Sequence, residues 1–178
     1  FRIYGLSSLF LVFTAAVFLL IALYSAYSVF GKKYAGLYML CLYLSLAMVN
    51  GAMIADNLSV MLFFWEGMLC TLTGILLMGN FENPKTAVKA LTMCGISDLL
   101  LMLGLVITSV TAETAEISEL SVIPAEGAGA IGFALLILGA VGKAGGMPFH
   151  SWIPDSASDT PAAFMAAFPG AFGKILGV

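Results

Sequence analysis

Long runs of apolar residues, separated by short polar turns, divide the chain into six segments. A helix needs roughly 20 apolar residues to cross the ~30 Å hydrocarbon core of a bilayer. Because backbone groups in lipid must be hydrogen-bonded within their own segment, runs of this length are expected to be helical. The predicted spans are Leu6–Phe30, Tyr34–Ala55, Leu58–Gly79, Pro84–Val110, Ala128–Pro148 and Pro161–Val178. The pattern predicts an all-α fold, a polytopic transmembrane helix bundle of about six spans in a single domain covering residues 1–178.

The composition favours a membrane protein and excludes a water-soluble fold. Hydrophobic residues make up 61% of the chain, charged residues only 10%, and the mean hydropathy is +1.06. Soluble domains carry about 25% charged residues because their surfaces face water. The three cysteines, Cys41, Cys70 and Cys94, lie singly in apolar runs, which is not the spacing of a metal site. We therefore expect no metal and no redox cofactor in this chain, and no nucleic-acid partner.

The distribution of charge along the turns predicts the orientation in the membrane. Basic residues gather at two turns that this topology places on one side: Lys32, Lys33, Lys85 and Lys89. The segment Thr111–Gly127, on the other side, has four glutamates and no basic residue. By the positive-inside rule the lysine side is cytoplasmic, and the loop from His150 to Thr160 is expected to face the same way. Lys85 and Lys89, with Glu82, are interpreted as interfacial anchors and nothing more.

Three ionisable residues interrupt the apolar spans: Glu66 in the third, Asp98 in the fourth and Lys143 in the fifth. A Lys or Asp at a helix centre costs about 2.5–3.5 kcal/mol even on the translocon scale. Such residues persist when they face a bundle interior, pair with one another or line a water path. Two acids and a lysine on successive spans favour a proton relay, and the alternative is an ion pair that only locks helices together.

The fifth span is predicted to be interrupted. Gly145 and Gly146 loosen the helix, and Pro148 cannot donate an amide hydrogen bond. Interrupted helices at membrane depth are tolerated only where they are buried or line a cavity. His150, the single histidine, follows the break, and imidazole exchanges protons near neutral pH. A hydrogen-bonded loop histidine is the alternative. Lys174 in the last span either extends a polar path or reaches towards an interface.

Several short motifs together carry a family resemblance. They are Gly-Ala-Val-Gly-Lys at 139–143, Met-Pro-Phe-His-Ser-Trp-Ile-Pro-Asp at 147–155, Thr-Pro-Ala at 160–162, Trp65-Glu66 and Ser97-Asp98. In order and spacing they resemble the antiporter-like membrane subunits of NADH:quinone oxidoreductase, of membrane-bound hydrogenases and of Mrp-type sodium/proton antiporters. The resemblance covers roughly residues 56–178. The chain begins with Phe1 and ends in an apolar run, which is typical of a fragment of a longer subunit, about its third to eighth helices.

The resemblance implies a proton-translocating subunit of a redox-driven complex, complex I-like or hydrogenase-linked, in a prokaryotic inner membrane. Redox chemistry would belong to other membrane-complex subunits, and this chain would hold no cofactor. Glu66 and Lys143 would form the charge pair whose separation drives protonation changes, with Lys143 as the proton-holding centre. Asp98 matches the same pattern, and His150 and Lys174 would lie on the onward path.

Two departures from the family pattern concern the end of the chain. Residues 159–163 read Asp-Thr-Pro-Ala-Ala where the family often has Pro-Thr-Pro-Val-Ser-Ala, and the histidine common in the following helix is not visible. This tail is more similar to the hydrogenase-linked branch. The electron-donating partner is therefore left open by the sequence. An Mrp-type sodium/proton antiporter subunit is an alternative function, because the sequence does not separate protons from sodium, and a structural membrane scaffold with a locking ion pair is another.

Overall fold

The computed structural model describes residues 1–79, 84–120, 127–160 and 162–167. These residues are predominantly helical, and an isolated bridge between Asn57 and Glu116 is the only β-type pairing among them. The elements are α1 (Gly5–Val29), α2 (Ala35–Ile54), α3 (Leu58–Gly79), α4 (Lys85–Ala112), the 3-10 helix η1 (Ile117–Glu119), α5 (Ala128–Lys143), the 3-10 helix η2 (Phe149–Ser151), α6 (Trp152–Asp159) and α7 (Ala162–Ala167). The predicted all-α class is confirmed.

Four of the described helices, α1 to α4, are long and apolar enough to cross a bilayer. Their ends agree within two residues with the first four predicted spans. Helix α5 has 16 residues, and a helix of that length rises only about 24 Å. Of the sixth predicted span, α7 falls within the described residues, whereas 168–178, with Lys174, lies outside them.

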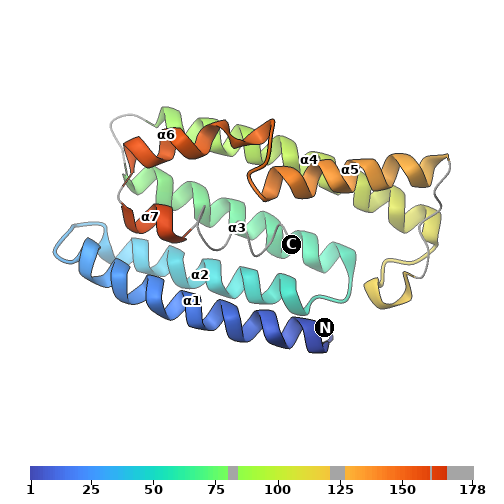
Figure 1. The fold of residues 1–178 in the computed structure, drawn as a ribbon, viewed down its shortest axis with the longest axis horizontal. Helices are drawn as coiled ribbons and strands as arrows, with labels where there is room; N and C mark the ends of the chain where they lie inside the picture. The colour runs from blue at the N-terminus through green and yellow to red at the C-terminus, as the bar shows by residue number, and fades with distance from the viewer. Residues whose placement is uncertain (80–83, 121–126, 161, 168–178) are drawn as a thin grey trace.

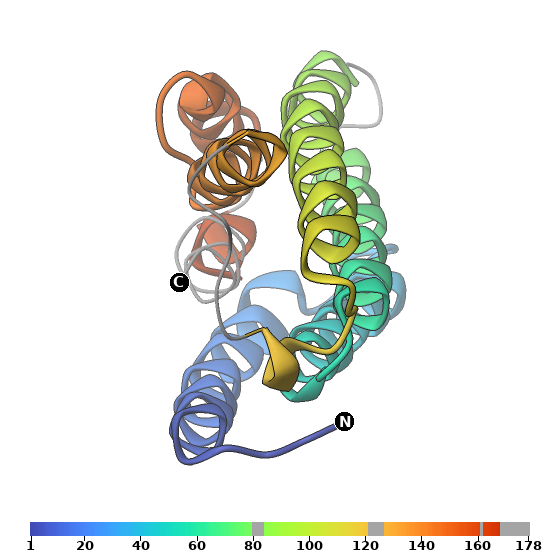
Figure 2. The ribbon, with the colours of Figure 1, turned by 90° about the vertical axis from the view of Figure 1, so that its right-hand side faces the viewer.

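The long helices run up and down, and the shorter ones pack against α4 and α1 (Figure 1). Helix α5 lies along the later part of α4 (Figure 1). Helix α6 lies along the first part of α4, and Figure 2 shows the same bundle end-on. The α1–α2 turn, the start of α4 and α6 lie at one end of the bundle, and the α2–α3 turn and η1 lie at the other. The predicted basic side and acidic side are thus at opposite ends.

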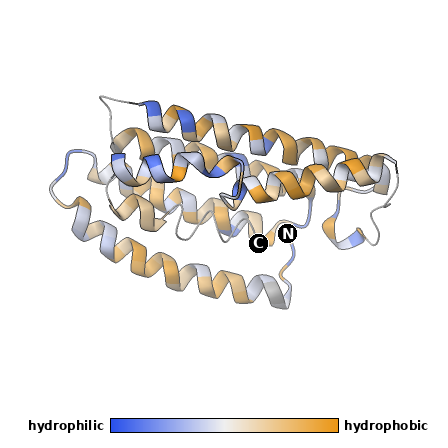
Figure 3. Cartoon of the chain, turned by 45° about the horizontal axis from the view of Figure 1, so that its top comes forward, coloured by the Kyte–Doolittle hydropathy of each residue, from blue (hydrophilic) through white to orange (hydrophobic). Residues whose placement is uncertain are grey.

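The outer faces of the long helices are apolar, as Figure 3 shows, and hydrophilic residues gather at the start of α4 and along α6. On α1, side chains such as Leu9, Phe13 and Leu20 are more than half exposed. Between α2 and α3, the buried hydroxyl of Ser45 donates to Thr71 over 2.9 Å. Apolar outer faces on helices long enough to cross a bilayer suit a lipid solvent, so the chain is an integral membrane protein.

At the acidic end, the segment after α4 is fixed to the α2–α3 turn. The Asp56 carboxylate accepts hydrogen bonds from the backbone N–H and the hydroxyl of Ser118, each 3.1 Å long. The N–H of Leu58 donates to the carbonyl of Ala115 over 2.9 Å. These bonds fix the segment before Leu120 against the start of α3. They lie at the end of the α3–α4 interface that is nearer the acidic segment.

In the stretch from His150 to Thr160, all residues up to Asp159 belong to η2 or α6, so the prediction of a loop there was wrong. Trp152 and Ser156, one turn apart on α6, are both buried, and the Ser156 hydroxyl donates to the Trp152 carbonyl over 2.5 Å. Pro154 lies in the first turn of α6, where its missing N–H has no intrahelical partner to lose. Burial of this face on the bundle stabilises a helix of 8 residues, which is too short to be stable alone.

Candidate functional site

The central feature of the site is a buried ion pair between α4 and α5. The ammonium of Lys143 lies 2.6 Å from Oδ1 of Asp98, and the two side chains are only 7% and 4% exposed. Asp98 lies near the middle of α4, and Lys143 is the last residue of α5. Removing one partner of such a pair typically costs 3–5 kcal/mol, because it leaves a buried charge uncompensated.

The end of α5 favours a cation at position 143. The N–H of Gly146 donates to the carbonyl of Val141 over 2.8 Å, and that of Gly145 donates to Gly142 over 3.0 Å. These two bonds form a Schellman motif, and it requires the left-handed conformation that Gly145 adopts, with φ of 72°. The partial negative charge of the helix C-terminus stabilises the Lys143 ammonium further. The helix therefore ends inside the bundle with its lysine facing inward.

Close packing of α4 on α5 brings the pair together. Every fully buried residue of α5 is a glycine: Gly129, Gly132, Gly139 and Gly142. A Cβ atom on Gly139 would lie 2.8 Å from the Cα of Leu101, and one on Gly132 would lie 2.9 Å from a methyl group of Ile107. Small residues let membrane helices approach this closely. The glycine positions thus set the distance across which Lys143 reaches Asp98.

Glu66 is not the observed partner of Lys143. It is half-buried near the middle of α3, and among the described residues its carboxylate makes no ion pair. It lies close enough to Asp98 to act on that carboxylate electrostatically. The neighbouring Trp65 ring faces the ammonium of Lys143, with its centroid 5.9 Å away. Because α5 packs along α4 and not along α3, Asp98 is the acid that meets the lysine.

Two further polar groups lie at the ion pair. The hydroxyl of Ser97 and the indole N–H of Trp65 are buried, and neither finds a hydrogen-bond partner among the described residues. A buried donor without a partner is disfavoured by about 1–3 kcal/mol. The site therefore combines an ion pair with two hydrogen-bond donors, from Ser97 and Trp65, that can bind a water molecule.

The other predicted site residues lie apart from the pair. His150 is exposed on η2, and within the described part of the chain its side chain makes no hydrogen bond. Lys174 lies outside the described residues. Gly145, Gly146 and Pro148 lie in the connection between α5 and η2, where the continuous helix ends.

A polar cluster that the sequence analysis missed joins α4 to α6. Lys89, interpreted as an anchor only, forms an ion pair of 2.6 Å with Asp155. Lys85 is exposed, in keeping with an anchoring role, and Glu82 lies outside the described residues. The signal was present in the spacing, since Asp155 and Asp159 lie four apart and face the same way once the segment is known to be helical.

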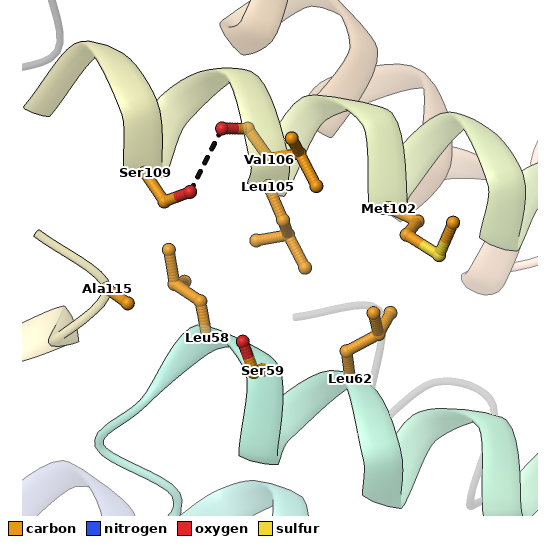
Figure 4. A pocket seen from close by; sticks show the side chains of 8 residues that line it. All are labelled: Leu58, Ser59, Leu62, Met102, Leu105, Val106, Ser109 and Ala115. Atoms are coloured by element: carbon orange, nitrogen blue, oxygen red, sulfur yellow. Dashed lines mark hydrogen bonds between the residues drawn. The ribbon is translucent and has the colours of Figure 1, made fainter. Parts of the chain in front are cut away.

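A shallow pocket lies between α3 and α4 nearer the acidic end (Figure 4). Its lining is mostly apolar, with Leu58, Leu62, Met102 and Leu105 facing one another across it. The hydroxyl of Ser109, at its rim, donates to the carbonyl of Val106 in its own helix over 2.9 Å. Among the described residues, its lining has no ionisable side chain.

Most of the chain matches one known protein family. Residues 55–176 match the family described as NADH:quinone oxidoreductase/Mrp antiporter, transmembrane. The chain belongs to this family. The matched region includes Glu66, Asp98 and Lys143, so the ion pair between α4 and α5 lies within the antiporter-like domain. A comparison with curated proteins finds no match.

Solved structures support the same assignment at the level of the fold. The chain is similar to part of the membrane-bound sulfane sulfur reductase, an archaeal respiratory membrane complex, with a TM-score of 0.78 and 25% sequence identity. The similarity covers 96% of this chain and 28% of the related chain. This antiporter-like chain therefore spans less than a third of the length of that relative.

Proposed function

We propose that this chain is the proton-translocating part of an antiporter-like subunit in a redox-driven membrane complex, with Lys143 as the proton-holding group. The observation that carries the proposal is the buried Lys143–Asp98 ion pair at the interrupted end of α5. The similarity to a chain of an archaeal respiratory complex supports a setting among other membrane subunits that carry out electron transfer.

The chemistry follows from the position of the charges. The Asp98 carboxylate stabilises the proton on Nζ of Lys143 while the two lie 2.6 Å apart. When Asp98 is neutralised or the pair separates, the ammonium becomes a buried charge without a counter-ion, and loss of its proton relieves that cost. Glu66, within electrostatic range of Asp98, is the second acid towards which Lys143 would turn, and this exchange is the proposed switch.

Two other functions are compatible with family membership, and each predicts a different result in a transport assay. A sodium/proton antiporter would use the same acids for a metal cation, and its flux would depend on sodium. A scaffold would use the ion pair only to hold α4 against α5. The donors of Ser97 and Trp65, which have no partner among the described residues, favour transport because they can hydrogen-bond a water molecule on a proton path beside the ion pair.

Asp98→Asn tests the proposal, since it removes the counter-charge and keeps the size of the side chain. We expect the assembled complex to pump about tenfold fewer protons per electron, because the variant leaves the Lys143 ammonium buried without its counter-ion, which typically costs about 3–5 kcal/mol. The measurement is proton uptake per electron in proteoliposomes after assembly has been verified, with Asp98→Glu as the charge-retaining control.

Repeating the assay in sodium-free buffer separates the two ions. Unchanged pumping without sodium supports protons, and pumping that requires sodium supports the antiporter alternative. A variant that assembles poorly, while its assembled fraction pumps at the full ratio, would instead identify the pair as a lock between helices.

A further inference from the structure

Helix α4 contacts the chain on both sides of the interruption after Lys143. The chain turns aside at Gly145 and continues as η2 and α6 in the same overall direction, so α5 does not by itself fix where the later segment lies. Helix α6 packs against the first half of α4, the same helix that holds Asp98 (Figure 1). Both sides of the interruption are therefore attached to one continuous helix.

Three polar contacts from two residues of α4 hold the segment after the interruption. The ammonium of Lys89 lies 2.6 Å from Oδ2 of Asp155, and it also donates to the carbonyl of Ser151 over 3.1 Å. The hydroxyl of Thr86 donates to Oδ2 of Asp159. Residues 86 and 89 share one face of α4, and 155 and 159 share one face of α6. Two contacts at matched spacing fix both the position and the rotation of α6.

The ion pairs on the two sides of the break place opposite charges on α4. On one side of the break, α4 presents an acid, Asp98, to the lysine that ends α5. On the other side, α4 presents a lysine, Lys89, to an acid of α6. The two α4 residues lie nine positions apart, about 14 Å along a helix. The connection from 144 to 151 thus lies between two ion pairs. Because it is short, a shift of α6 would also displace the end of α5, where Lys143 lies.

We propose that Lys89 and Asp155 are positioning residues for ion transport, which hold the interrupted segment so that Lys143 stays against Asp98. This inference rests on the proposed function for its effect on pumping, but not for its effect on structure. The pair is partly exposed, with side chains 37% and 46% accessible, so its effect is expected to be moderate. The additional bond to the Ser151 carbonyl distinguishes it from a simple surface pair.

The test compares Lys89→Ala, Asp155→Asn and the double variant in the intact complex. Hydrogen exchange is followed in residues 141–146 and 152–159, and protons pumped per electron are measured on the same preparations. We expect exchange in both segments to rise about two- to fivefold, the range for a partly exposed ion pair, and the pumping ratio to fall by a similar factor. The double variant should be no worse than Lys89→Ala alone, because Lys89→Ala already removes both the ion pair with Asp155 and the bond to the Ser151 carbonyl.

Lys85→Ala is the matched control, since Lys85 is an exposed lysine one turn before Lys89 on the same helix. It should leave both measurements unchanged. Lys89→Arg retains the cation and should recover both of them, which also answers the case in which Lys89→Ala assembles poorly.

Faster exchange confined to 152–159, with 141–146 and the pumping ratio unchanged, would overturn the inference and leave Lys89 as an anchor of α6 alone. Effects that multiply in the double variant would also contradict it. If Lys143→Ala still pumps, the proposed function fails, yet exchange at 141–146 still decides whether the Lys89–Asp155 contact positions the end of α5.

Discussion

Lys143→Ala is expected to abolish proton pumping by the parent complex while the complex still assembles. The variant removes the group that holds the proton, and it leaves the Asp98 carboxylate buried without its partner at 2.6 Å. The α4–α5 interface should survive, because it is built mainly from glycine contacts such as Gly139 against Leu101. The measurement is protons pumped per electron in proteoliposomes, with Lys33→Ala, an exposed turn lysine, as the control.

A double variant, Lys143→Ala with Asp98→Ala, separates transport from stability. Removing both charges leaves no uncompensated charge in the interior, whereas removing one of them typically costs about 3–5 kcal/mol. We therefore expect the double variant to assemble better than Lys143→Ala and still not to pump. Full pumping by either variant would show that Lys143 is only a structural partner of Asp98.

Gly139→Ala is expected to weaken the contact between α4 and α5. A Cβ atom at this position would lie 2.8 Å from both the Cα and the backbone nitrogen of Leu101, so the backbones must move apart. Overpacking of this kind costs about 1–3 kcal/mol. The expected result is a lower yield of assembled complex and dissociation at a lower temperature, followed by native gel electrophoresis across a temperature series.

Gly95→Ala provides the matched control for that experiment. Gly95 lies in α4, one turn from Asp98, and a Cβ atom there would have no neighbour within 4 Å. Replacing a helical glycine by alanine in open space stabilises a helix by about 0.5–1 kcal/mol. Equal stability of Gly139→Ala and Gly95→Ala would contradict the role assigned to glycine packing in positioning the ion pair.

Much of the fold could be predicted from the sequence because its causes are local. The transfer of apolar residues into lipid and the need for internal backbone hydrogen bonds determine the long helices α1 to α4, whose ends matched within two residues. The end of α5 is local as well, since Gly145 supplies the left-handed residue that terminates the helix at Lys143. The ionisable residues within the spans were equally visible, because charges stand out in apolar runs.

The pairing of those residues was decided by the tertiary structure. Glu66 and Asp98 are both acids within spans, and local patterns cannot tell which of them meets Lys143. That choice depends on glycines that bring α5 against α4, and on the packing of Trp65 beside the ammonium. The same holds for α6, a short helix with a proline that is stable because Trp152 is buried and Asp155 meets Lys89. By itself the sequence determined the membrane spans and their charges, whereas contacts between distant segments decided which charges act together.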